Sequence, residues 1–133
     1  MNNTIRSFTA KAKLDETGEF EEFTWDLSPT ISDSETLHLK NDGLPKLGVR
    51  LSPGMILIGK IGKTKAYLTS ANPTALELNA LDFQELRERF GHLWKNTSVY
   101  VPKDCWGVVE SADCTEDDSG RKIAVVRVRL DTR

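Results

Sequence analysis

The side chains of this chain that could take part in chemistry are two histidines, two cysteines, many acids and a basic segment near its end. His38 and His92 have no second histidine or cysteine at ligand spacing, and Cys105 and Cys114 lack the further ligands of a zinc site. The sequence also lacks a G-x-S-x-G nucleophile motif and a complete glycine-rich phosphate loop. No acid lies in an apolar run, where burial would raise its pKa for proton transfer. We therefore predict no enzymatic activity, no catalytic residues, no metal and no cofactor.

The basic segment offers a candidate contact surface. Arg127 and Arg129 alternate with apolar residues and so share one face of a predicted strand, with Arg121 and Lys122 at its entrance. A basic strand can contact a phosphate backbone, although this one has no aromatic residue on which a base could stack. We predict that the residues contacting RNA or a protein partner are Arg121, Lys122, Arg127 and Arg129.

Two other features leave alternatives open. Lys65 precedes an alanine, as the modified lysine of a carrier domain does, but threonine and tyrosine flank this pair in place of acids or methionine. Trp25, Trp94 and Trp106 are candidates for an exposed recognition patch, although tryptophans more often pack in or beside a core. Such a patch would belong to an alternative function, that of a structural or protein-interaction domain with an unrelated partner.

Composition limits the class of protein. The chain has 133 residues, with 18 basic and 20 acidic side chains, which predicts a single domain over residues 1–133 with a formal net charge of -2. Residues 15–26 contain six acids and residues 110–118 contain five, and neither segment contains a base, a pattern typical of charge pairing between strands. The longest apolar run, residues 55–58, is too short to cross a membrane, and the start of the sequence lacks the apolar core of a secretory signal. We expect a cytoplasmic protein with no membrane partner.

Short strands must position these residues. Apolar residues alternate with polar ones in three segments, with Phe8, Ala10, Ala12 and Leu14 in the first; residues 23–27 and 124–130 are the others. Met55 to Ile61 is apolar on both faces as far as Gly59, which predicts one central strand that follows a turn at Pro53-Gly54. Gly59 would allow another backbone to approach closely before Lys60 returns to solvent. Turns are also predicted at residues 42–43 and 118–120.

A single helix is predicted on this mostly β body. Asp82 and Glu85 form an acidic capping box, and Phe83, Leu86 and Phe90 recur on one face before a glycine that favours a helix end. The helix is therefore expected to run from Phe83 to Phe90.

The segment at residues 41–61 reads NDGLPKLGVRLSPGMILIGKI and resembles a segment of the bacterial RNA polymerase β subunit with the outline V-x-x-G-D-I-L-V-G-K. Other short motifs of that family have similar counterparts here in the same order. They are EEFTWDLSP at 21–29, LRERFG at 86–91, NTSVYVP at 96–102, GVV at 107–109 and VRVRL at 126–130.

In that family the region is the flap, or wall, which has a barrel-sandwich hybrid fold, borders the RNA exit channel and binds sigma and elongation factors. The resemblance implies a free-standing flap-like domain whose partners are polymerase subunits, sigma or elongation factors, or nascent RNA. Its fold-defining turn and strand residues would be Gly48, Pro53, Gly54 and Gly59. Asp113 to Lys122 is too short for the helical flap tip of the family, so a tight turn is expected there. The paired-lysine motif and the metal-binding aspartates of the polymerase have no counterpart in the sequence, so this chain is not expected to polymerise RNA alone.

Overall fold

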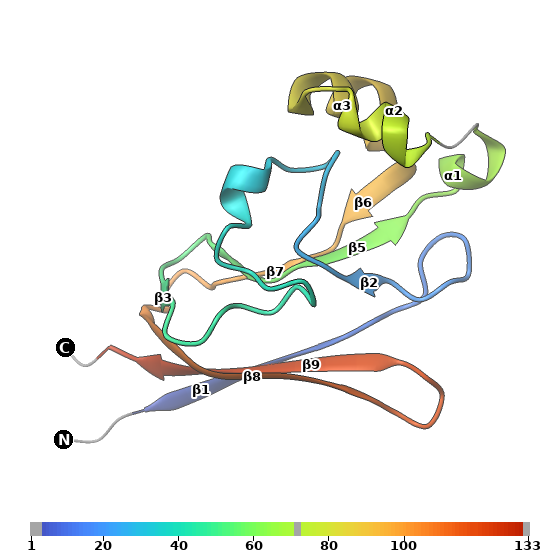
Figure 1. Cartoon of the computed structure of the whole chain (residues 1–133). Helices are drawn as coiled ribbons and strands as arrows, with labels where there is room; N and C mark the ends of the chain where they lie inside the picture. The colour runs from blue at the N-terminus through green and yellow to red at the C-terminus, as the bar shows by residue number, and fades with distance from the viewer. Residues whose placement is uncertain (1–3, 71–72, 132–133) are drawn as a thin grey trace.

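The computed structural model describes residues 4–70 and 73–131, and strands form most of its regular structure (Figure 1). The strands are β1 (Ile5–Lys11), β2 (Glu22–Phe23), β3 (Arg50–Leu51), β4 (Ile56–Ile58), β5 (Lys60–Lys63), β6 (Trp94–Asn96), β7 (Val99–Tyr100), β8 (Gly107–Glu116) and β9 (Lys122–Leu130). The helices are α1 (Ala66–Thr69), α2 (Ala75–Asn79) and α3 (Phe83–Phe90), with 3-10 turns η1 (Asp33–Glu35) and η2 (Gly91–Leu93). The mostly β class predicted from the sequence is confirmed.

A four-stranded antiparallel sheet, in the order β1-β9-β8-β3, forms one side of the molecule (Figure 1). The predicted alternation in β9 is confirmed, because Ala124, Val126 and Val128 are buried while Arg127 and Arg129 are exposed. The register of β8 against β9 shifts between Val109 and Ser111, which makes Glu110 the extra residue of a bulge.

The central apolar segment forms two strands in different sheets, where the sequence predicted one. β4 pairs with β7, whereas β5 pairs with β2 and β6. The chain divides at Gly59, whose N–H donates to the Gly43 carbonyl and whose carbonyl accepts from Thr24 N–H. These bonds to two separate loop residues replace ladder bonds at Gly59, and the chain passes there from one sheet to the next.

Two of the predicted strands are shorter than expected. Of the strand predicted at residues 23–27, only Phe23 lies in a strand, β2, because the Leu27 N–H bonds back to the Trp25 carbonyl and the chain turns. Leu14 is 60 % exposed, contrary to the predicted dry face, since it lies beyond β1 and bridges only to Phe20 in a small hairpin.

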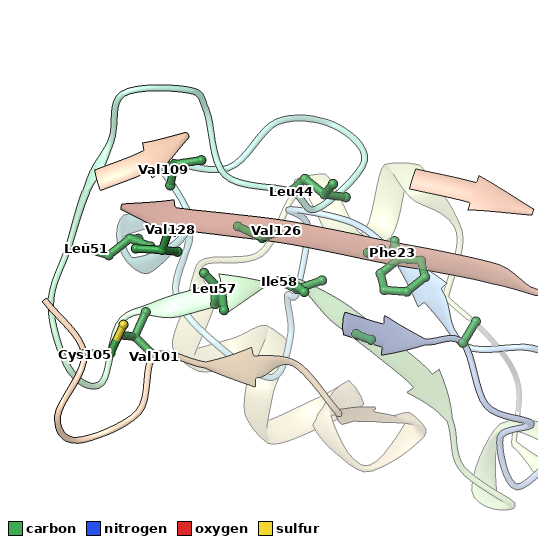
Figure 2. Close-up of a cluster of buried hydrophobic side chains, with 13 residues drawn as sticks. Phe23, Leu44, Leu51, Leu57, Ile58, Val101, Cys105, Val109, Val126 and Val128 are labelled. Carbon is green, nitrogen blue, oxygen red and sulfur yellow. The ribbon is translucent and has the colours of Figure 1, made fainter. Parts of the chain in front are cut away.

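The hydrophobic core has two parts. The larger cluster lies against the inner face of the four-stranded sheet and joins Val126 and Val128 of β9 to Leu57 and Ile58 of β4 (Figure 2). The smaller cluster contains Leu27, Leu39, Ile56 and Ile61. Because β4 contributes to both clusters, it is buried on both faces, as the sequence predicted.

The prediction of a single helix is wrong, although the predicted bounds of α3 are confirmed. The Asp82 side chain accepts from Glu85 N–H at 2.9 Å and caps α3. After Phe90 the chain continues into η2, with Gly91 at an ordinary helical φ of -58°. The extra helices α1 and α2 are four and five residues long, too short to give a helical periodicity in the sequence. Each helix that the structure describes is also too short to cross a membrane.

Candidate functional site

The outer face of the four-stranded sheet carries the two arginines predicted to make contacts. Arg127 lies opposite Ser7 of β1 and Ser111 of β8, and Arg129 lies opposite Ile5 and Val108. Within residues 4–70 and 73–131, no carboxylate forms an ion pair with either guanidinium. We call this surface, comprising Ser7, Ser111, Arg127 and Arg129, the basic face.

Sequence reasoning missed three residues that the strand pairing brings beside the two arginines. Ser7 and Ser111 flank Arg127, and Arg50 of β3 follows Val108 in the row that contains Arg129. The Arg50 guanidinium already contacts the Asp131 carboxylate, at 2.8 and 3.0 Å, so its charge is largely matched. No local signal reveals these neighbours, because they come from strands far apart in the sequence.

Arg121 and Lys122 do not join the basic face. The guanidinium of Arg121 lies over the Phe20 ring, 5.6 Å from its centroid. Lys122 lies opposite Glu116 in the register of β8 and β9. It is on the same side of β9 as the buried residues Ala124 and Val126, and therefore on the opposite side from Arg127 and Arg129. The structure therefore separates the four predicted residues into a pair on the basic face and two residues at the hairpin end.

The hairpin between β8 and β9 is closed by a turn at residues 117–121, as expected from the sequence. The Asp117 carboxylate accepts from the N–H groups of Ser119 and Arg121, both at 2.9 Å, and Gly120 has a φ of 81°. The Ser119 hydroxyl also donates to this carboxylate, at 2.7 Å, and together with the N–H of Arg121 it holds the pKa of Asp117 below its ordinary value. The turn adds no helix to the end of the hairpin.

The residues predicted to define the fold occupy the expected local structures. The Pro53-Gly54 turn is closed by a bond from Met55 N–H to the Ser52 carbonyl at 3.2 Å, with Gly54 at a φ of 88°. Gly48 has a φ of 80° and its N–H donates to the Val109 carbonyl ahead of β3. Gly59 lies so close to Thr24 that a Cβ atom would overlap the Thr24 carbonyl oxygen, which confirms the predicted close approach.

Lys60 is buried, and the prediction that it returns to solvent is wrong. Its Nζ atom lies 2.5 Å from Oε1 of Glu21, and each side chain is only 7 % exposed. The same oxygen accepts from Lys13 N–H at 2.8 Å. The pairing of β2 with β5 brings the acid and the base together, because Phe23 lies opposite Lys60 and Glu21 is only two residues before Phe23.

A second ion pair joins Lys63 to Glu19, at 2.7 Å but near the surface. The acids at 15–26 are thus partly matched by lysines of β5.

The pH dependence of stability should reflect this buried pair. Burial raises the pKa of Glu21, but the hydrogen bonds from Lys60 and Lys13 outweigh it and leave the pKa below its ordinary value. A lowered folded-state pKa means that the pair stabilises the fold fully above the unfolded value of about 4.3 and loses this contribution as the pH falls below it. In urea unfolding between neutral and acid pH, a Glu21→Leu/Lys60→Met variant should therefore lose less stability than the parent chain. An equal loss in both proteins would contradict the assignment.

The tryptophans divide into two environments. Trp25 and Trp94 are half-buried against the smaller core cluster, whereas Trp106 is 44 % exposed. The cysteines are both free, Cys105 in the larger core cluster and Cys114 at the surface. Burial raises the pKa of the Cys105 thiol.

Comparison with known proteins links the chain to RNA polymerase subunits. A family model described as RNA polymerase Rpb2, domain 6, matches residues 2–133. The chain is also 35 % identical over 79 residues to a protein of Pleurastrum terricola described as the DNA-directed RNA polymerase subunit beta C-terminal section. That alignment covers 59 % of this chain and 8 % of the relative, so the chain corresponds to a small part of the relative's length.

Proposed function

Because the chain belongs to the RNA polymerase Rpb2 domain 6 family, we propose that it is a non-catalytic, flap-like module that contacts nascent RNA in a transcription assembly. The family match over residues 2–133 supports a role in transcription. The basic face carries the proposal of RNA contact, since its two guanidiniums are exposed and without acidic partners in the described part of the chain.

The chemistry of the basic face suits a phosphate backbone. Guanidinium groups form strong, paired hydrogen bonds with phosphate oxygens, and serine hydroxyls such as those of Ser7 and Ser111 donate further bonds. The face presents no aromatic side chain in its two arginine rows, so we expect contacts with the backbone and little sequence preference. With a net charge of only -2, the chain as a whole offers no general attraction for RNA.

The short turn at the end of the β8–β9 hairpin limits where this module can contact its partners. A flap of this kind lacks a helical tip, so we propose that its contacts come from the sheet surface. Other polymerase subunits would hold the module beside the transcript, and the assembly would work in the cytoplasm.

An Arg127→Ala/Arg129→Ala variant tests this function. Two lost phosphate contacts should weaken binding to single-stranded RNA and reduce the slope of log affinity against log salt concentration by about 1.4, because each contact contributes about 0.7 for a single strand. Fluorescence anisotropy of a labelled oligouridine, titrated at several salt concentrations, measures both effects.

The matched control is Lys46→Ala/Lys103→Ala, which removes the same charge from exposed loop positions that are not part of the basic face. The control should keep the salt slope of the parent chain. If both variants lower the slope equally, binding depends on net charge and the basic face has no special role.

A further inference from the structure

A pocket is lined by residues of α2, α3, β2, β5 and β6. Figure 1 shows α2 and α3 above β6, away from the four-stranded sheet that carries the basic face. Its volume is about 540 Å³, within the range of pockets that hold small ligands or single side chains. The walls include the indoles of Trp25 and Trp94 and the side chains of Leu81 and Leu86. The lining also includes three exposed acids, Glu22, Asp26 and Asp33, which we call the rim.

The aromatic walls are held in place by the core behind them. Trp25 and Trp94 both pack against the smaller cluster, which includes Leu27 and Ile61. The Tyr67 ring meets the Trp94 ring edge-on, with centroids 5.6 Å apart and an interplanar angle of 63°. This packing holds both tryptophans where they line the pocket, so ordering them on binding should cost little entropy.

The rim has an excess of negative charge. Glu22 and Asp33 are exposed, and among the described residues neither forms an ion pair with a lysine or arginine. Asp26 is oriented by Ser28, whose hydroxyl donates to Oδ1 at 2.7 Å. The described lining contains no basic side chain that would match these acids.

Indole faces and unmatched carboxylates together select a cation. A guanidinium stacks on an indole face and can bond carboxylate oxygens with its edge, whereas lysine offers only a point charge. RNA phosphates would be repelled by the three acids, and a purely apolar segment would bury these carboxylates without partners. Leu81 and Leu86, which also line the pocket, would pack against apolar residues that flank the cation in its own chain.

We propose that this pocket binds an arginine side chain, flanked by apolar residues, from a protein partner. The site is separate from the basic face, and its occupancy does not depend on RNA binding. The partner therefore presents a peptide segment in which apolar residues flank an arginine.

The test uses tryptophan fluorescence of the full chain in a Trp106→Phe background, which removes the indole outside the pocket. The chain is titrated with the capped peptide Leu-Arg-Leu and with Leu-citrulline-Leu, which has the same shape and no charge. We expect saturable quenching by the arginine peptide and about tenfold weaker binding of the citrulline peptide. Equal binding of the two peptides, or no saturable change with either, would overturn the proposal.

A pair of charge variants locates the site. Glu22→Gln/Asp33→Asn removes two rim charges, and Glu35→Gln/Glu110→Gln removes two exposed charges that do not line the pocket. The first should weaken the arginine peptide about tenfold, whereas the second should leave it unchanged. Equal effects would assign the binding to net charge. Both variants should bind oligouridine at least as well as the parent, so failure of the pocket proposal is distinguished from failure of RNA binding.

Discussion

A Lys60→Met substitution is expected to destabilise the chain by about 3 kcal/mol or more, because it leaves the Glu21 carboxylate buried without its cation. Both side chains are 7 % exposed, and the Lys60 ammonium is within 2.5 Å of the carboxylate. The methionine fills a similar volume, so the loss measures mainly the unpaired charge. Urea unfolding at neutral pH, followed by circular dichroism, gives the change in the free energy of unfolding.

Two further variants make this prediction specific. Adding Glu21→Leu to Lys60→Met should recover most of the lost stability, because a buried pair replaced by apolar residues is often neutral. Lys63→Met breaks the exposed pair with Glu19 and should cost no more than about 1 kcal/mol. A Lys60→Met cost as small as that of Lys63→Met would show that the buried pair does not contribute as described.

The buried pair also marks a limit of sequence reasoning. Lys60 follows a glycine after an apolar run, a pattern that predicts return to solvent. Its partner lies 39 residues away, and only the β2–β5 register brings the two together. Burial of a charge depends on such a long-range partner, so no local pattern could reveal it.

The candidate contact surface could be predicted in part. Strand alternation is a local property, and it correctly placed Arg127 and Arg129 on one exposed face. The serines beside Arg127, by contrast, depend on the pairing of β9 with both β1 and β8. The pocket depends on still more distant segments, since β2, β6 and two helices all contribute to it. Turn residues and helix caps act within a few positions, which is why the bounds of α3 and the turn at Gly54 were predictable.

The structural role of Gly59 is larger than the local sequence pattern indicates. The sequence correctly predicted a close backbone approach at this residue, but it did not reveal the change of sheet that occurs there. Gly59 bonds to Gly43 and Thr24 through its own N–H and carbonyl groups, at 2.8 and 3.0 Å. These two bonds fix the loop against the junction of β4 and β5, which leaves no room for a side chain.

Gly59→Ala is therefore expected to destabilise the chain by about 3 kcal/mol or to prevent folding, because its Cβ atom would overlap the backbone oxygen of Thr24. Backbone cannot move aside as a flexible side chain can, so relief would require breaking the two hydrogen bonds. Gly48→Ala is the matched control: Gly48 has a φ of 80° but no atom within 4 Å of an added Cβ, so only backbone strain of about 1–2 kcal/mol should appear. Urea midpoints of the two variants, or the soluble folded fraction where one does not refold, test the contrast. A Gly59→Ala protein as stable as Gly48→Ala would mean that opening the junction costs no more than the backbone strain at Gly48, and the close approach would then not hold the two sheets together at this residue.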